Sequence, residues 1–265
     1  MSMTAAETSH ARPSLSELRA VCQPVDVLGR VNGEHWAGRY YMRHVSIHLT
    51  RALVGARISA DAVTWLMIAS GLLAALALTV PHPAAPVATF LLIQVQLLLD
   101  CSDGELARWR GTCSPKGIYL DRIGHYSTDA ALVAALGVRV DGGLGDIGGW
   151  TTMGLVVAVL VLMVKSETDL VHVARGLGGR PPLSDTGSQL RPGALRAARR
   201  MVRLFPFHRA LLAIELSLLT VVAGLVDAIT SGLLGSRILL VALVPIAVVV
   251  VTGHLLSILR SDKLR

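Results

Sequence analysis

Charged side chains are scarce in this chain of 265 residues: only 16% are Asp, Glu, Lys or Arg, whereas 52% are hydrophobic. Soluble globular domains carry about 25% charged residues, so this composition, with a mean hydropathy of +0.58, excludes an ordinary soluble domain. Cysteine is scarce as well. Three cysteines, Cys22, Cys101 and Cys113, are odd in number and lack zinc-finger spacing, which excludes a disulfide framework. The composition instead indicates a single domain embedded in a membrane.

An apolar leader is also missing, because residues 1–20 are polar, and we therefore expect no cleavable signal peptide. Residues 1–22 contain Ser, Ala and Pro and are expected to be loosely ordered. The segment 23–58 mixes aromatic and basic side chains and lacks the 18 or so uncharged residues that a span needs. This mixture is typical of an amphipathic helix that lies at the cytoplasmic membrane interface.

Long apolar runs make up most of the remaining chain, residues 59–265. Six of them approach the roughly 20 residues of a membrane-spanning helix: 62–80, 84–99, 117–138, 147–164, 210–229 and 238–259. The third run is unusual because it contains Asp121, Arg122, His125 and Asp129. We therefore predict an all-α integral membrane protein, a six-transmembrane-helix bundle preceded by an N-terminal interfacial helix.

Basic side chains are distributed unevenly along the chain, which has a formal net charge of +7. Of the 25 Lys and Arg residues, 23 fall in the N-terminal segment, the 108–116 and 165–209 loops, at Arg122, or in the C-terminal tail. The alternate loops hold only Arg139 and Arg237. By the positive-inside rule, both termini and the loops 108–116 and 165–209 face the cytoplasm of a multi-pass protein, which we expect in the cell's inner membrane. The same rule accounts for the basic charge, so no nucleic-acid partner is expected.

Acidic side chains gather where the second and third predicted spans meet the cytoplasm. One helical face there carries Asp100, Asp103, Gly104 and Ala107. A second face, with a spacing of four, carries Gly117, Asp121, His125 and Asp129. The loop between them is short, so the two faces should converge.

Three converging carboxylates repel one another unless a cation lies among them. Oxygen ligands in this number suit Mg²⁺ or Mn²⁺. The simpler alternative is that each carboxylate forms an interfacial salt bridge with Arg108, Arg110 or Arg122. Ionisable groups inside spans are costly and by default mark a functional site, so the metal interpretation is favoured for the group as a whole.

The spacing of these residues resembles a known signature. The pattern Asp100-x2-Asp103-Gly104-x2-Ala107-Arg108-x8-Gly117-x3-Asp121-x3-His125 is similar to that of the CDP-alcohol phosphotransferases (the CDP-alcohol phosphatidyltransferase family), and seven of eight fixed positions match. A weaker likeness covers Arg39 to Thr64, where Ala60 and Asp61 replace the Pro and Asn of a Thr-Pro-Asn-x-x-Thr pattern. This N-terminal part is most similar to the branch of inositol-phosphate transferases and di-inositol-phosphate synthases.

The resemblance implies an enzyme that transfers a phosphoalcohol from a CDP-linked donor to an alcohol acceptor and releases CMP. It implies that Asp100, Asp103 and Asp121 hold Mg²⁺ or Mn²⁺, which bridges the donor pyrophosphate. It also assigns the donor-binding residues, with small side chains giving the CDP moiety room and an arginine supporting a phosphate: Gly104, Ala107, Arg108, Gly117, Asp61 and Thr64. A homodimer is implied by the family likeness alone.

The last position of the signature departs from the family, because His125 replaces an Asp that serves as metal ligand and general base. An imidazole is a suitable base near neutral pH but a poorer ligand for Mg²⁺. Asp129, one turn deeper, could hold the ring in one tautomer. The alternatives are that His125 only packs, or that it marks a catalytically silent paralogue.

Three classes of function remain at this point. The favoured one is an enzyme of phospholipid biosynthesis that uses CDP-diacylglycerol as donor and is in contact with membrane lipid. Its acceptor is a polar alcohol, which can itself be phosphorylated, such as inositol phosphate or glycerol phosphate. The second uses a soluble donor such as CDP-inositol. The third is a transporter or a silent scaffold that binds nucleotide or metal, but a transporter should show related halves, and the acidic group lies at one membrane face.

Other ionisable residues support two interpretations each. Glu215 and Asp227 can line a cavity or form interhelical hydrogen bonds, and His254 is expected to pack. A basic cluster can capture a phosphorylated acceptor or contact anionic lipid: Arg191, Arg196, Arg199, Arg200 and Arg203.

Overall fold

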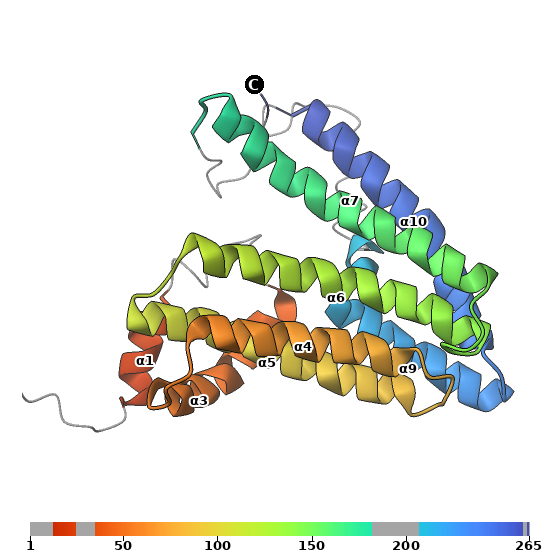
Figure 1. Cartoon of the computed structure of the whole chain (residues 1–265), viewed down its shortest axis with the longest axis horizontal. Coiled ribbons are helices and arrows are strands. Elements are labelled where there is room, and N and C mark those ends of the chain that lie inside the picture. The colour runs from red at the N-terminus through yellow and green to blue at the C-terminus, as the bar shows by residue number, and fades with distance from the viewer. Residues whose placement is uncertain (1–12, 25–34, 182–206, 262–263, 265) are drawn as a thin grey trace, which may run out of the picture. The chain divides into compact units, whose positions relative to one another are not determined.

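The computed structural model describes residues 13–24, 35–181, 207–261 and 264. Within these ranges the regular elements are all helical and no strand is present, which confirms the all-α prediction. In chain order they are α1 (Leu15–Cys22), the π-helical turn η1 (Gly38–Met42), α3 (Arg43–Val54), α4 (Ala60–Leu78), α5 (Ala85–Arg110), α6 (Pro115–Asp141), α7 (Gly149–Leu177), the 3₁₀ turn η2 (Phe207–Leu211), α9 (Ala213–Thr230) and α10 (Leu234–Leu259) (Figure 1). The basic cluster at 191–203 lies outside the described residues.

Four described helices, α4, α5, α9 and α10, are long and apolar enough to cross a membrane, and they support the prediction of a membrane protein. The two other predicted spans, 117–138 and 147–164, lie inside α6 and α7, which have 27 and 29 residues. Helix α6 carries several charged side chains along its length, among them Asp121, Asp129 and Arg139.

The chain forms two compact units. Unit 1 comprises residues 1–67 and 96–121, and unit 2 comprises residues 68–95 and 122–265. The boundaries fall inside α4, α5 and α6, so these three helices contribute to both units.

Part of the segment that we expected to be loosely ordered, residues 1–22, forms helix α1 of unit 1. Its start is a capping box, in which the Ser14 hydroxyl accepts the Glu17 amide and the Glu17 side chain accepts the Ser14 amide. Leu18 and Cys22 are fully buried in a small apolar cluster with Ile47 of α3. This cluster, rather than helix propensity alone, holds so short a helix.

In unit 2, helix α10 packs against both α7 and α9 (Figure 1). Helices α6 and α7 cross closely at two glycines. A Cβ on Gly137 would lie 2.5 Å from the carbonyl oxygen of Trp150, and one on Gly154 would lie 2.9 Å from that of Val133. Glycine is therefore required at this crossing, as is common where membrane helices meet.

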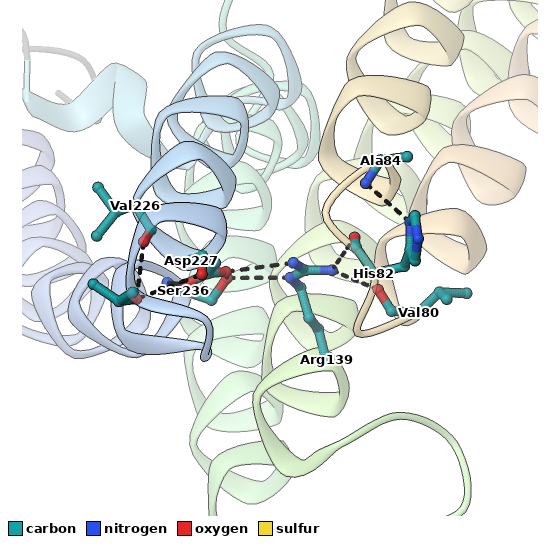
Figure 2. A network of polar contacts seen from close by, with 8 residues as sticks. Val80, His82, Ala84, Arg139, Val226, Asp227 and Ser236 are labelled. Atoms are coloured by element: carbon teal, nitrogen blue, oxygen red, sulfur yellow. Dashed lines mark hydrogen bonds and ion pairs between the residues drawn. The ribbon is translucent and has the colours of Figure 1, made fainter.

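A buried ion pair joins four segments of unit 2 (Figure 2). The side chains of Arg139 and Asp227 are 1% and 2% exposed and lie 3.3 Å apart. Arg139 also donates to Ser236 Oγ and to the carbonyls of Val80 and His82. Asp227 accepts the amide and hydroxyl of Ser236, in the first turn of α10, where it satisfies a helix-end donor. Asp227 thus forms interhelical bonds, the second of the two interpretations offered for it.

Candidate active site

A cavity of about 440 Å³ lies in unit 1, among α3, the first turn of α4, the last turns of α5 and the first turns of α6. Nine of the ten residues predicted from the sequence to form the site line this cavity: Asp61, Thr64, Asp100, Asp103, Gly104, Ala107, Arg108, Gly117 and Asp121. The convergence of two acidic faces across a short loop, inferred from spacing alone, is therefore present in the structure.

The tenth predicted residue, His125, belongs to a group of possible metal ligands. Asp100, Asp121 and His125 can each offer one ligand atom, and these atoms lie within 4.8 Å of one another. Asp121 and His125 are one turn apart on α6, so the helix fixes their relative placement. Two carboxylates and an imidazole are a donor set that suits Mn²⁺, and Mg²⁺ through its oxygen ligands. The residues present therefore fit a divalent metal ion.

Asp103, which lies on α5 with Asp100, is held by a residue of α4. Its Oδ2 accepts a hydrogen bond of 2.6 Å from the Thr64 hydroxyl. Asp103 is 8% exposed, so this bond orients a nearly buried carboxylate. Thr64 thereby acts on the acidic group through Asp103.

Asp61 and Gly117 form another part of the wall. Lys116 Nζ lies 2.8 Å from Asp61 Oδ2, and Ser114 Oγ accepts the amide of Gly117 at the start of α6. A Cβ added at Gly117 would lie 3.6 Å from Ser114 Oγ and 3.9 Å from Asp61 Oδ1, which is ordinary contact. The protein itself would accommodate alanine here, so the absence of a side chain leaves room in the cavity.

Arg108 lies across the face of α5, where Gly104 gives it space. A Cβ on Gly104 would come within 3.2 Å of Arg108 Nη1. The Nε of Arg108 donates to the carbonyl of Cys22, the last residue of α1, at 2.7 Å. Its Nη2 is buried and has no hydrogen-bond partner. This cationic group is therefore anchored at one side, and Arg108 is one of the residues that line the cavity.

Asp129, which we expected to orient the His125 ring, anchors α6 within unit 2. Its Oδ2 lies 2.7 Å from Lys165 Nζ of α7, and its Oδ1 accepts the amide of Ala213 at the start of α9. The orienting role of Asp129 stays a prediction. His254, expected to pack, forms a hydrogen bond of 3.1 Å between its Nε2 and Thr168 Oγ1.

One charged residue of the cavity lining was missed by the sequence reasoning. Arg43, the first residue of α3, lines the cavity, but its segment was interpreted only as an interfacial helix. The signal that could have found it is the likeness from Arg39 to Thr64, which placed this arginine upstream of the predicted site without assigning it a role.

The comparison with protein families covers the region of the cavity. The sequence profile of the family described as CDP-alcohol phosphatidyltransferase matches residues 57–226, well over half of the chain, and includes every predicted site residue. No curated protein matches the chain. Members of this family transfer a phosphoalcohol from a CDP-alcohol donor to an alcohol acceptor and typically use a divalent metal. The chain belongs to the CDP-alcohol phosphatidyltransferase family.

Proposed function

We propose that this chain is a membrane enzyme that transfers a phosphatidyl group from CDP-diacylglycerol to a polar alcohol acceptor, such as inositol phosphate or glycerol phosphate, and releases CMP. The observation that carries the proposal is the cavity of unit 1, which brings nine of the ten predicted site residues together beside the ligand atoms of Asp100, Asp121 and His125. In the reaction, the acceptor oxygen forms a bond to the phosphatidyl phosphorus, the bond to CMP breaks, and the acceptor proton leaves.

Each of the ten predicted site residues has a role in this proposal. Asp100, Asp121 and His125 would hold the metal ion, with Asp103 beside them, and a bound Mg²⁺ or Mn²⁺ would neutralise charge on the donor diphosphate. Gly104, Ala107 and Gly117 leave space for the CDP moiety, and Asp61 and Thr64 complete that wall. Arg108 supports a phosphate. His125 can instead accept the acceptor's proton, as its replacement of an Asp suggests.

The proposal includes the membrane arrangement. Helices α4, α5, α6, α7, α9 and α10 would span an inner membrane, with both termini and the site at the cytoplasmic side, as the distribution of basic residues favours. Helix α3 would lie at the interface, which the 74% exposure of nearby Tyr40 supports. By family likeness the enzyme is a homodimer.

Two alternatives each have an observation in their favour. The likeness from Arg39 to Thr64 to the inositol-phosphate branch favours a soluble donor such as CDP-inositol. The substitution of His125 for the family's Asp favours a catalytically silent paralogue that still binds nucleotide or metal.

The decisive experiment is a CMP-release assay on the purified full chain in detergent. CDP-diacylglycerol and CDP-inositol are offered separately with a panel of free and phosphorylated alcohols, with Mg²⁺, Mn²⁺ or excess chelator. We expect release with CDP-diacylglycerol that needs metal. CMP release with CDP-inositol but not with CDP-diacylglycerol would mean that the donor is soluble. Full activity in excess chelator would mean that the reaction needs no metal ion. Nucleotide binding without release from any donor would establish the silent paralogue.

A further inference from the structure

The cavity of unit 1 has a basic wall as well as an acidic one. Asp61, Asp100, Asp103 and Asp121 account for the acidic side chains that line it, and Arg43 and Arg108 account for the arginines. Arg43 lies outside the residues matched by the family profile, 57–226. Neither composition nor the family signature therefore explains why a second guanidinium group is directed to this cavity.

Arg43 is held in place by α5. Its Nη1 lies 3.2 Å from Glu105 Oε1 and donates to the carbonyl of Cys101 at 3.3 Å. Both partners are on the helix that also carries Asp100 and Arg108. The Arg43 side chain is 18% exposed, so it is largely enclosed but still borders the cavity.

Glu105 is the anchor of this arrangement. Its side chain is 0% exposed, and besides Arg43 it accepts three further hydrogen bonds from described residues. Ser46 and Thr50 of α3 donate hydroxyl groups at 2.7 Å each, and Gln23 donates its side-chain amide at 2.8 Å. A buried carboxylate with this many donors is oriented firmly and fixes α3, and with it Arg43, against α5.

Arg108 lies close enough to Arg43 for their charges to act on each other. Glu105 balances one of the two positive charges through its ion pair with Arg43, so a net positive charge remains on this wall and favours an anion. A phosphate group supplies both the negative charge and several acceptor oxygens, and the planar guanidinium fork matches it.

We propose that Arg43 and Arg108 form a phosphate-binding subsite in this cavity, and that Glu105 is the positioning residue that holds Arg43 there. The subsite rests on the proposed function for the source of its ligand, which is either a phosphate of the CDP-linked donor or a phosphate carried by the acceptor. The chemistry is the same in both cases, and binding measurements separate them.

The first test measures binding without turnover, using the full chain in detergent with Mg²⁺. CMP is the probe for the donor side, and inorganic phosphate, added with CMP at saturation, is the probe for the acceptor side. We expect Arg43→Gln to lower the affinity for one of these probes about 10- to 100-fold, the range for losing a charge-assisted hydrogen bond. Arg43→Lys should recover part of the lost affinity. Arg51→Gln is the control, because Arg51 lies on the same helix but donates to the Pro13 carbonyl, away from the cavity lining.

Weaker CMP binding in Arg43→Gln would assign the subsite to the donor, and weaker phosphate binding alone would assign it to the acceptor. Unchanged affinity for both probes in Arg43→Gln, or a wild-type protein that binds neither, would overturn the subsite. Failure of the CMP-release assay would not, because both probes are measured without a reaction. The two proposals therefore fail separately.

The second test concerns Glu105. We expect Glu105→Gln to lower the affinity for the same probe as Arg43→Gln does. The double variant should bind that probe no more weakly than Arg43→Gln alone. Thr50→Val is the matched control: it removes another hydrogen bond to Glu105 and should lower the melting temperature while leaving probe affinity unchanged. If Thr50→Val weakens the probe as much as Glu105→Gln does, Glu105 supports the fold and does not position Arg43.

Discussion

The carboxylates of the unit 1 cavity and the carboxylate of Asp227 in unit 2 all lie on long helices, but their surroundings are opposite. Asp100 and Asp121 border a cavity with ligand atoms within 4.8 Å of each other and of His125. Asp227 is buried against Arg139 and accepts both donors of Ser236 (Figure 2). An acidic residue in a membrane helix is therefore not a functional sign by itself. Convergence of like charges on a cavity indicates a ligand, whereas a matched buried pair indicates a structural role.

The same comparison helps to interpret Arg139 and Arg237, the two basic residues outside the set that was predicted to be cytoplasmic. Arg139 is fully buried in its ion pair, and Arg237 lies over the ring of Trp150, 5.8 Å from its centroid. Both are engaged within unit 2. Arg139 is therefore an internal residue and not a loop charge, so it does not count against the uneven distribution of basic residues on which the predicted orientation rests.

The largest expected effect is at the cavity. Asp121→Asn removes a charged ligand atom from the group with Asp100 and His125, and we expect CMP release to fall by at least about 10³-fold, since metal stabilisation contributes several kcal/mol. The melting temperature should stay close to that of the wild type, because Asp121 borders a cavity. If Asp121→Asn keeps wild-type turnover, or if it unfolds, then Asp121 does not differ from Asp227 in having a functional rather than a structural role.

The opposite outcome is expected in unit 2. Asp227→Ala leaves the buried Arg139 without its carboxylate, and we expect a loss of about 3–5 kcal/mol of unfolding free energy. Combining it with Arg139→Met should recover much of that loss, because no unpaired charge then remains. Thermal unfolding in detergent checks both. If the double variant is no more stable than the single one, the pair is not the reason for the stability of this end of unit 2.

Variants of His125 test whether this departure from the family pattern has a catalytic role, as at the cavity, or only a structural one, as at Asp227. If the imidazole takes the acceptor's proton, His125→Ala should lower kcat about 10²–10⁴-fold with little change in melting temperature. His125→Asp restores the family residue and serves as the matched variant. An aspartate variant faster than the wild type would support the silent-paralogue alternative, and an alanine variant with wild-type turnover would exclude His125 as base.

Much of the site was predictable because its information is local. The signature fixes spacing on two adjacent helices, and helical periodicity converts spacing into shared faces, so seven residues could be assigned to one cavity. The other two, Asp61 and Thr64, were assigned from the weaker likeness in the N-terminal part. The contacts of Glu105 with Ser46 and Gln23 cross 59 and 82 residues of sequence, and no periodicity encodes them. Helix α1 was missed although its capping box, Ser14 to Glu17, is readable, because composition was given more weight than the cap. The buried state of Arg139 depends on partners in three other segments and could not be inferred from its loop position.

The smallest expected effect lies at Asp141, two residues beyond Arg139, which accepts the amides of Gly148 and Thr151 and the Thr151 hydroxyl at the start of α7. Burial alone would raise the pKa of Asp141, but these hydrogen bonds outweigh it and hold the pKa below its ordinary value. A carboxyl with a lowered folded-state pKa stabilises the protein above the unfolded pKa of about 4, and the contribution is lost as pH falls through the folded value. Asp141→Asn should therefore melt slightly below the wild type at pH 7, and the difference should shrink below pH ~4. A gap that stays constant across this range would mean that Asp141 acts through shape and not through charge, unlike the carboxylates of the cavity.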